Sequence, residues 1–256
     1  SSAADLSFTE AMQTATGGDD FIAGRLANTS SEFYLKLYEA EEFIADTKFY
    51  FDSNLTLGLD PGYDAGAYNQ SSALASRLVE DDQGVAMGIN AMNVDSFEET
   101  TIPLVVNRAA GVTFRISLEG ITIPEGVEVY LEDTQESTFT DLRAGDFTLT
   151  PQSDLSGMGR FYLRLGNTNL GGDEVEESYI SIYKSKSENN ITIEGLVNVS
   201  KASVKLYNLL GQELLSQTLE TNISTQKIPT ERIKTGVYVV NLSVNGNTIT
   251  KKIIIN

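Results

Sequence analysis

Short β-type segments separated by turn residues constrain the fold of this chain more than any other feature. Five of them are rich in β-branched and aromatic residues and often alternate apolar with polar side chains: Phe33–Tyr38, Lys48–Phe51, Val112–Leu118, Val127–Leu131 and Arg160–Leu165. Only Ser72–Val79 and Ala3–Met12 have a pattern that could form a helical turn or two. A strand with one apolar face must bury it against another sheet, so the sequence predicts an all-β protein of two β-sandwich domains.

Length and charge divide the sequence into two units. The 256 residues, 41% of them hydrophobic, are enough for two packed cores at roughly 100–200 residues per domain. From Lys184 onward nine Lys and Arg stand against five Glu, a net charge of +4, so the preceding residues carry −22 within the total of −18. We predict an acidic, jelly-roll-like β-sandwich module over residues 1–178, ending in a Gly- and Asn-rich linker at about 167–178, and a small second domain over residues 179–256.

The residue types that the chain lacks exclude several chemistries. There is no Cys, His or Trp. Disulfides, thiolate or imidazole metal sites, Cys nucleophiles and Ser-His-Asp triads are therefore ruled out. A glycosidase that uses paired carboxylates is the enzymatic alternative, but no carboxylate pair lies in a recognisable motif. We expect no catalytic function.

Net charge and hydropathy also bear on partners and location. A chain with a net charge of −18 and a pI near 4.3 repels polyanions, so we expect no nucleic-acid partner. No stretch approaches the roughly 20 apolar residues that span a bilayer, and we expect no transmembrane segment. Because the start, Ser1–Asp5, has neither an initiator Met nor the pattern of a signal peptide, we expect the chain to be the tail of a longer precursor.

The carboxy-terminal unit carries the most specific motifs. Asn245-Gly246, between the strand patterns Gly236–Val244 and Asn247–Ile255, is a strong signal for a two-residue hairpin. Four motifs follow one another through this unit: Ile180–Tyr183, Val204–Gly211, Thr235–Val240 and Thr250–Ile255.

In their order and spacing these motifs resemble the type A C-terminal sorting domain of cargo proteins of the type IX secretion system of Bacteroidota, over about residues 179–256. The family commonly has a Pro-Asn-Pro-like turn after its first strand, where this chain has Lys184–Asn190. The resemblance implies an immunoglobulin-like sandwich recognised by the outer-membrane translocon, a shuttle barrel and a sortase-like peptidase. It also implies that the protein reaches the cell surface or is secreted.

The region 19–165 resembles, less specifically, the β-rich module that precedes sorting domains in many large Bacteroidota surface proteins. The motifs that carry this resemblance include Gly58–Ala65, Gly88–Met92 and Tyr130–Thr134. What the resemblance implies is mainly a position beside the sorting domain, and no activity is carried over from it. We expect a structural or accessory module at the end of a larger adhesin-like or enzymatic precursor. A calcium- or glycan-binding adhesion module is the alternative.

The closing strand and its partner supply the candidate partner-binding residues, which are Lys251, Lys252, Ile253, Ile254, Ile255, Gly236 and Tyr238. Strand alternation places Lys251, Ile253 and Ile255 on one face and Lys252 and Ile254 on the other. An apolar terminal strand can offer its edge or its side chains to a partner. The alternatives are that the isoleucines form a core strand and that the lysines are solvated residues protecting an edge.

Two further features of the first unit suggest ligands. Asp60 and Asp64, with Asp52 upstream, are candidate Ca²⁺ ligands because calcium prefers six to eight oxygen donors. Loop aspartates also cap turns, which is the alternative interpretation. The 11 Tyr and 11 Phe could include a sugar-stacking platform for a glycan, although most of them lie in strand patterns where burial in the core is the alternative.

Overall fold

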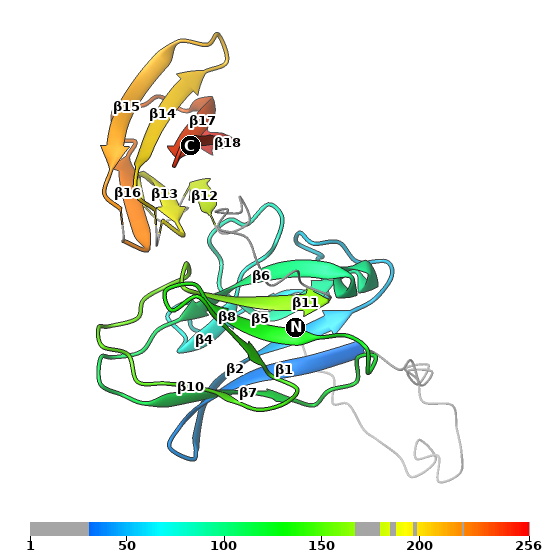
Figure 1. Ribbon diagram of the computed structural model, residues 1–256. Coiled ribbons are helices and arrows are strands. Elements are labelled where there is room, and N and C mark those ends of the chain that lie inside the picture. Colours follow the sequence, from blue (N-terminus) through cyan, green and yellow to red (C-terminus); the bar gives the residue numbers. More distant parts are fainter. Residues whose placement is uncertain (1–30, 167–179, 185–187, 197–198, 222, 256) are drawn as a thin grey trace, which may run out of the picture. The chain divides into compact units, whose positions relative to one another are not determined.

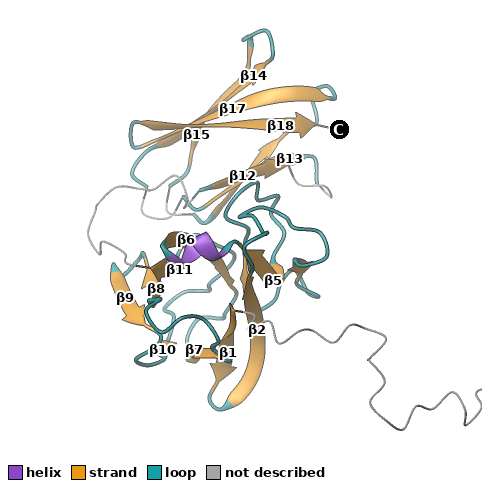
Figure 2. Cartoon of the chain, turned by 90° about the vertical axis from the view of Figure 1, so that its right-hand side faces the viewer, coloured by secondary structure: helices purple, strands orange, loops and turns teal. Residues whose placement is uncertain are grey.

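The structure is a computed structural model, and it describes residues 31–166, 180–184, 188–196, 199–221 and 223–255 (Figures 1 and 2). These residues all fall within one compact unit, Ser31–Asn256. Within the described ranges the regular elements are strands, apart from the 3₁₀ helix η2 (Val94–Phe97), which confirms the all-β class. The helical pattern at Ala3–Met12 and the linker predicted at about 167–178 lie outside these ranges.

The first part of the chain forms one continuous sheet of 11 strands in the order β10-β7-β1-β2-β5-β4-β6-β11-β8-β9, with β3 paired to β5. The strands are β1 (Ser31–Glu39), β2 (Glu42–Phe51), β3 (Ala65–Gly66), β4 (Leu74–Ser76), β5 (Met87–Met92), β6 (Glu99–Val106), β7 (Phe114–Glu119), β8 (Val129–Asp133), β9 (Thr138–Asp141), β10 (Phe147–Leu149) and β11 (Phe161–Gly166). The sheet curls into a nearly closed, barrel-like form around its core (Figure 1). Where the sequence predicted two separate sheets, the parallel pair β2–β5 and the short strand β4 join the two halves.

Alternating burial along the strands explains this core. In β1, Phe33, Leu35 and Leu37 are fully buried and the residues between them are partly exposed. Strand β2 is antiparallel to β1 and brings Phe49 against Phe33, with ring centroids 4.9 Å apart. The five strand segments predicted from the sequence coincide with β1, β2, β7, β8 and β11 to within a few residues.

The expected helical turn at 72–79 is wrong. The middle of this segment is β4, which pairs with β6 through Leu74 opposite Val106 and Ser76 opposite Leu104. All three residues of β4 are buried, so its backbone groups lie away from water and need partners in neighbouring strands. Strand pairing therefore overrides the local preference of this Ala- and Leu-containing segment for a helical turn.

The carboxy-terminal part forms two smaller antiparallel sheets. One has the order β12-β13-β16 and the other β15-β14-β17-β18. The strands are β12 (Ser181–Lys184), β13 (Asn190–Glu194), β14 (Ala202–Asn208), β15 (Glu213–Leu219), β16 (Thr225–Pro229), β17 (Gly236–Val244) and β18 (Asn247–Ile255). Ile182, Ile193 and Ile228 from the first sheet join Val240 and Leu242 from the second in one core cluster.

The predicted hairpin between β17 and β18 is confirmed. Asn245 and Gly246 form its turn with φ of 50° and 99°. Positive φ at both central residues is what a type I′ turn requires, and Asn and Gly tolerate it best. Strand β16 was not expected from the sequence, and Ile228 is its one buried apolar residue.

The stacked pair Phe33–Phe49 gives a direct test of the first core. Replacing Phe49 by Ala is expected to lower the free energy of unfolding by about 3–5 kcal/mol, because the cavity removes both burial and ring contacts. Chemical denaturation followed by tyrosine fluorescence measures this change. Phe43 lies on the same strand and is 51% exposed, so Phe43→Ala serves as the matched control and should change stability by less than about 1 kcal/mol. Equal losses in the two variants would contradict the assigned core.

Candidate partner-binding surface

The candidate surface is built on β18, an edge strand of its sheet. Strand β18 pairs with β17 from Val244–Asn247 at the turn to Gly236–Ile255 at the far end. Because the two-residue turn is closed by the hydrogen-bonded pair Val244–Asn247, every second residue of β18 counted from Asn247 bonds to β17. The residues between them, from Thr248 to Ile254, direct their backbone N–H and C=O groups away from β17.

The three terminal isoleucines divide between core and surface. Ile253 and Ile255 are 5% and 3% exposed and belong to the core, whereas Ile254 is 57% exposed. Lys252 is exposed and lies on the same side of the strand as Ile254. The core interpretation therefore holds for Ile253 and Ile255, and Ile254 with Lys252 is the part of the motif that faces outward.

Lys251 differs from its neighbour Lys252 in environment. The Nζ of Lys251 lies 3.4 Å from Asp81 Oδ1 in the loop that follows β4. The lysine side chain is 32% exposed and the aspartate side chain 88%, so the pair is largely solvated. Such an exposed pair contributes little free energy, about 0–1 kcal/mol.

Gly236 and Tyr238 lie together at the start of β17. A Cβ at Gly236 would meet the Tyr238 ring at 3.3 Å, tighter than usual, so glycine leaves room for the ring to lie over the strand. The ring is 7% exposed, and its hydroxyl donates a hydrogen bond to the Lys234 carbonyl at 2.6 Å. These two residues therefore act through local packing, and a partner would meet mainly the side chains around them.

A groove of about 860 Å³ lies next to Tyr238. Its lining includes Leu214 and Leu215 of β15 and Ile233, Arg232 and Lys234 of the segment before β17. None of its lining residues except Tyr238 was among the candidate site residues predicted from the sequence. Leu214, which is 44% exposed, and its neighbour Leu215 are the apolar residues that β15 contributes to the groove.

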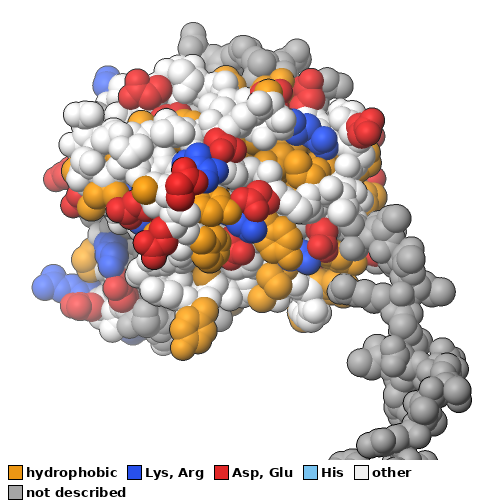
Figure 3. All heavy atoms as spheres, turned by 90° about the horizontal axis from the view of Figure 1, so that it is seen from below, with side chains coloured by type: hydrophobic (Ala, Val, Ile, Leu, Met, Phe, Trp, Pro, Cys, Tyr) orange, Lys and Arg blue, Asp and Glu red, His pale blue; other side chains and the backbone are white. Residues whose placement is uncertain are grey.

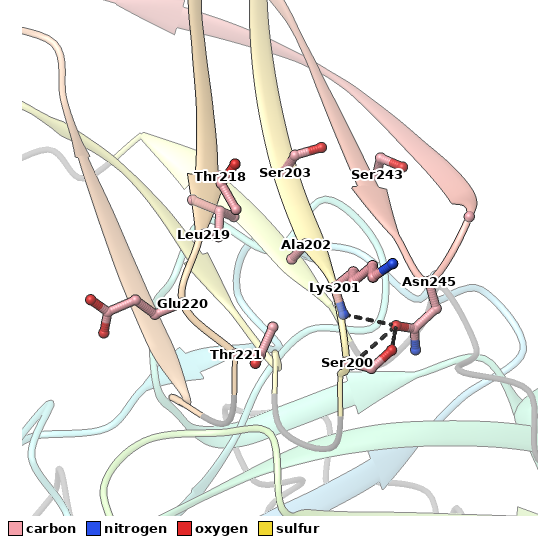
Figure 4. A pocket seen from close by; sticks show the side chains of 11 residues that line it. Ser200, Lys201, Ala202, Ser203, Thr218, Leu219, Glu220, Thr221, Ser243 and Asn245 are labelled. Carbon is pink, nitrogen blue, oxygen red and sulfur yellow. Dashed lines mark hydrogen bonds between the residues drawn. The ribbon is translucent and has the colours of Figure 1, made fainter.

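A second pocket, of about 710 Å³, lies at the opposite ends of β14, β15 and β17 (Figure 4). Asn245 Oδ1 accepts hydrogen bonds from the backbone N–H groups of Ser200 and Lys201 and from the Ser200 hydroxyl, at 2.8–3.2 Å. The hairpin turn is thereby fixed to the start of β14. Most of the other lining residues are small or polar, and Glu220 and Lys201 are its charged members. This arrangement resembles a surface depression more than a catalytic site.

The candidate calcium ligands accept hydrogen bonds from their own loops. Asp64 Oδ1 and Oδ2 accept the backbone N–H groups of Ala91 at 2.7 Å and Asp60 at 2.6 Å, while burial raises the Asp64 pKa. Asp60 accepts from Thr56, and Asp52 accepts from Asn54. Within the described residues no three His, Cys, Asp or Glu side chains gather as a group that could hold a metal ion. The calcium site stays a prediction, and turn capping accounts for the contacts seen.

Acidic and basic side chains are interspersed on the face shown in Figure 3, with hydrophobic groups between them. Among the described residues, Lys36 pairs with Glu119 and Lys48 with Glu32, both at 2.8 Å. In the part of the chain that the structure describes, no helix is long and apolar enough to cross a membrane.

Comparison with known families finds a match in the carboxy-terminal part of the chain. Residues 169–256 match the family described as the secretion system C-terminal sorting domain. This match begins ten residues before the boundary predicted at 179 and includes all of β18. A search of the curated proteins finds no match to the chain. Residues 169–256 are therefore a type IX C-terminal sorting domain, and the protein that carries them is cargo exported across the outer membrane to the cell surface or the medium.

Proposed function

We propose that this chain is a non-catalytic region of an exported protein, in which the first sheet is a structural or accessory module and residues 179–256 are read by the export machinery. The partners are the outer-membrane translocon, a shuttle barrel and a sortase-like peptidase. The observation that carries the proposal is an exposed apolar residue, Ile254, on the free edge of the last strand of a matched sorting domain.

The strand order supports an immunoglobulin-like assignment for this domain. Lettered A to G in chain order, its seven strands form an A-B-E sheet and a D-C-F-G sheet. Immunoglobulin-type sandwiches place A, B and E in one sheet and C, F and G in the other. The fourth strand, β15, joins the C-F-G sheet here. All pairs are antiparallel, as this architecture requires.

The edge of β18 offers a physical mechanism for recognition. The outward-directed backbone groups from Thr248 to Ile254 could accept a strand from a partner, with Ile254 and Lys252 supplying side-chain contacts. Long exposed edges promote aggregation, and proteins usually protect them with charges. Lys252 next to Ile254 is consistent with that protection before a partner binds.

Export of a reporter tests this proposal. A fluorescent protein fused in front of residues 1–256 should reach the exterior of a type IX-competent host, and deletion of Lys251–Asn256 should leave it in the periplasm. Ile254→Asp should reduce export about tenfold or more, because a charge replaces an apolar contact at the proposed interface. The extracellular fraction is measured by fluorescence and immunoblotting.

Leu214→Asp is the matched control for Ile254→Asp. Leu214 is 44% exposed on β15, the opposite edge of the same sheet, against 57% for Ile254 on β18. Circular dichroism of both purified variants should show the parent fold. If Leu214→Asp and Ile254→Asp reduce export equally, or neither does, the β18 edge is not the recognised surface.

A glycan-binding role for the first module is the second candidate, favoured by exposed tyrosines in one loop region. Tyr63 is 55% exposed and stacks against Tyr50, with centroids 6.2 Å apart and planes 18° apart. Tyr68 is fully exposed. Exposed rings of this kind can stack on the apolar face of a sugar. Binding to a glycan array that is lost in Tyr63→Ala, with Tyr130→Ala as a control elsewhere on the sheet, would support this function; an array without signal would remove it.

Calcium is tested separately by thermal unfolding with 5 mM calcium chloride, against the same concentration of magnesium chloride as a control. We expect no shift in Tm, because N–H groups already point at the carboxylates of Asp52, Asp60 and Asp64. A ligand that binds only the folded state raises Tm by mass action. A calcium-specific rise that disappears in Asp60→Asn would restore the calcium hypothesis.

A further inference from the structure

We propose that the first module binds the sorting domain within the same chain, through Arg77 and an acidic docking loop, Val79–Gly84, that cover the β12–β13 side of that domain. This inference concerns a contact between the two halves of the described structure. It goes beyond the proposed export function and does not depend on it.

A buried ion pair forms the centre of the contact. The Nη2 of Arg77 lies 2.7 Å from Glu194 Oε2 at the end of β13, and each residue is 5% exposed. Asp82 of the docking loop adds a second carboxylate, with Oδ1 3.6 Å from Arg77 Nη1. Arg77 and Glu194 are 117 residues apart in sequence, so this pair joins the two sheets across the chain.

Two hydrogen bonds fix the backbone of Arg77 within the first sheet. Its N–H donates to the Pro103 carbonyl at 2.9 Å, and its carbonyl accepts from the Asn90 side-chain amide at 2.8 Å. Pro103 belongs to β6 and Asn90 to β5, so two strands of the first sheet fix the residue. The first module therefore fixes the backbone position from which the Arg77 side chain reaches Glu194.

The docking loop makes further polar contacts with the sorting domain. Asp82 Oδ2 accepts a hydrogen bond from the Ser181 hydroxyl at 2.6 Å, while its Oδ1 accepts the Gly84 N–H at 2.9 Å. Asp81 reaches Lys251 of β18 at 3.4 Å. Between the loop and β12 remains a space of only about 90 Å³, lined by apolar as well as polar side chains of both halves. The contact therefore combines polar and apolar side chains of both halves.

Gly84 fits directly under Tyr183 of β12. A Cβ at Gly84 would come within 2.1 Å of two atoms of the Tyr183 ring, which no side chain could tolerate without a shift. The guanidinium of Arg77 lies 5.6 Å from the centroid of the same ring. Burial beside Glu194 raises the pKa of Tyr183 to about 12, so the phenol stays neutral at physiological pH. The ring is therefore held between the loop and the ion pair.

Glu194 loses its ion-pair partner when the two halves separate, whereas Arg77 keeps Asp82, 3.6 Å away within its own half. A buried carboxylate without its counterion is strongly unfavourable, so separation would require Glu194 to be rehydrated. The acidic loop also meets a cation of the second unit, because Asp81 Oδ1 lies 3.4 Å from Lys251 Nζ. Docking leaves Lys252 and Ile254 outside the contact, on the exposed side of β18.

Two glycine variants of the full chain test the contact. Gly84→Ala introduces the clash with Tyr183, whereas Gly111→Ala introduces a Cβ with nothing within 4 Å at nearly the same φ, +76° against +78°. Both carry the same backbone strain in the first module. Hydrogen–deuterium exchange of β12 and β13 should be about tenfold faster or more in Gly84→Ala than in Gly111→Ala, because undocking uncovers these strands.

A charge pair cycle tests the same contact from the sorting-domain side. Glu194→Gln and Arg77→Met should each accelerate exchange in β12 and β13, and the double variant should do so by less than the product of the two effects. Exchange in the paired strands β1 and β2 and in the paired strands β14 and β17 should stay at the parent rate. Unchanged rates there would show that each half remains folded. Arg164→Met, which disrupts a buried pair with Glu132 at 2.8 Å inside the first sheet, should leave β12 and β13 unchanged.

Two results would overturn the proposal. One is equal exchange of β12 and β13 in Gly84→Ala and Gly111→Ala. The other is strictly multiplicative effects of Glu194→Gln and Arg77→Met, which would mean that the two side chains act independently. If Gly84→Ala also loosens β1–β2, the cycle at Glu194 decides the outcome, because that residue lies outside the first module.

Discussion

The rest of the structure depends on strands that are apolar on one face and polar on the other. Strand β17 shows this constraint most simply, since Tyr238, Val240, Leu242 and Val244 are buried while the residues between them are partly exposed. Such a strand is stable only when a second apolar layer covers it. The carboxy-terminal part meets this need with two small sheets, whereas the first part curls a single sheet around its own core.

A sheet that is not fully closed has edge strands, and the edge strands of the two parts differ in length. The long first sheet ends in β10 and β9, which are only 3 and 4 residues long and offer little unpaired backbone. The sorting domain instead ends a sheet with β18, a strand of 9 residues with Ile254 exposed on it. Short edges discourage strand addition, whereas a long edge with an exposed apolar residue favours it. The first sheet thus has short edge strands, β9 and β10, whereas β18 is a long one. This difference is consistent with a recognition role for β18.

The local sequence pattern was sufficient to predict a strand that buries several alternate residues. It was not sufficient to predict the other strands. The hairpin of β17 and β18 could be predicted because period-2 alternation and Asn245-Gly246 agree with the final fold. Strand β16 could not, because Ile228 is its single buried apolar residue and Pro229 argues against a strand. Ser72–Val79 was misjudged because β4 owes its conformation to β6, which lies far away in sequence. The ion-pair partner of Arg77 could not be predicted either, because Glu194 is 117 residues away in the sequence.

The two kinds of charge contact between the halves differ in what they can contribute. Lys251 and Asp81 are solvated, and water and salt compete for them, so their pairing adds little to affinity. Arg77 and Glu194 are buried, and the cost of removing both charges from water offsets much of their attraction. Their contribution is therefore one of geometry, because a displacement that separates them takes the Glu194 carboxylate away from its counterion, while Arg77 keeps Asp82 at 3.6 Å. The close fit of Gly84 under the Tyr183 ring and the ion pair together select one arrangement of the two halves over others.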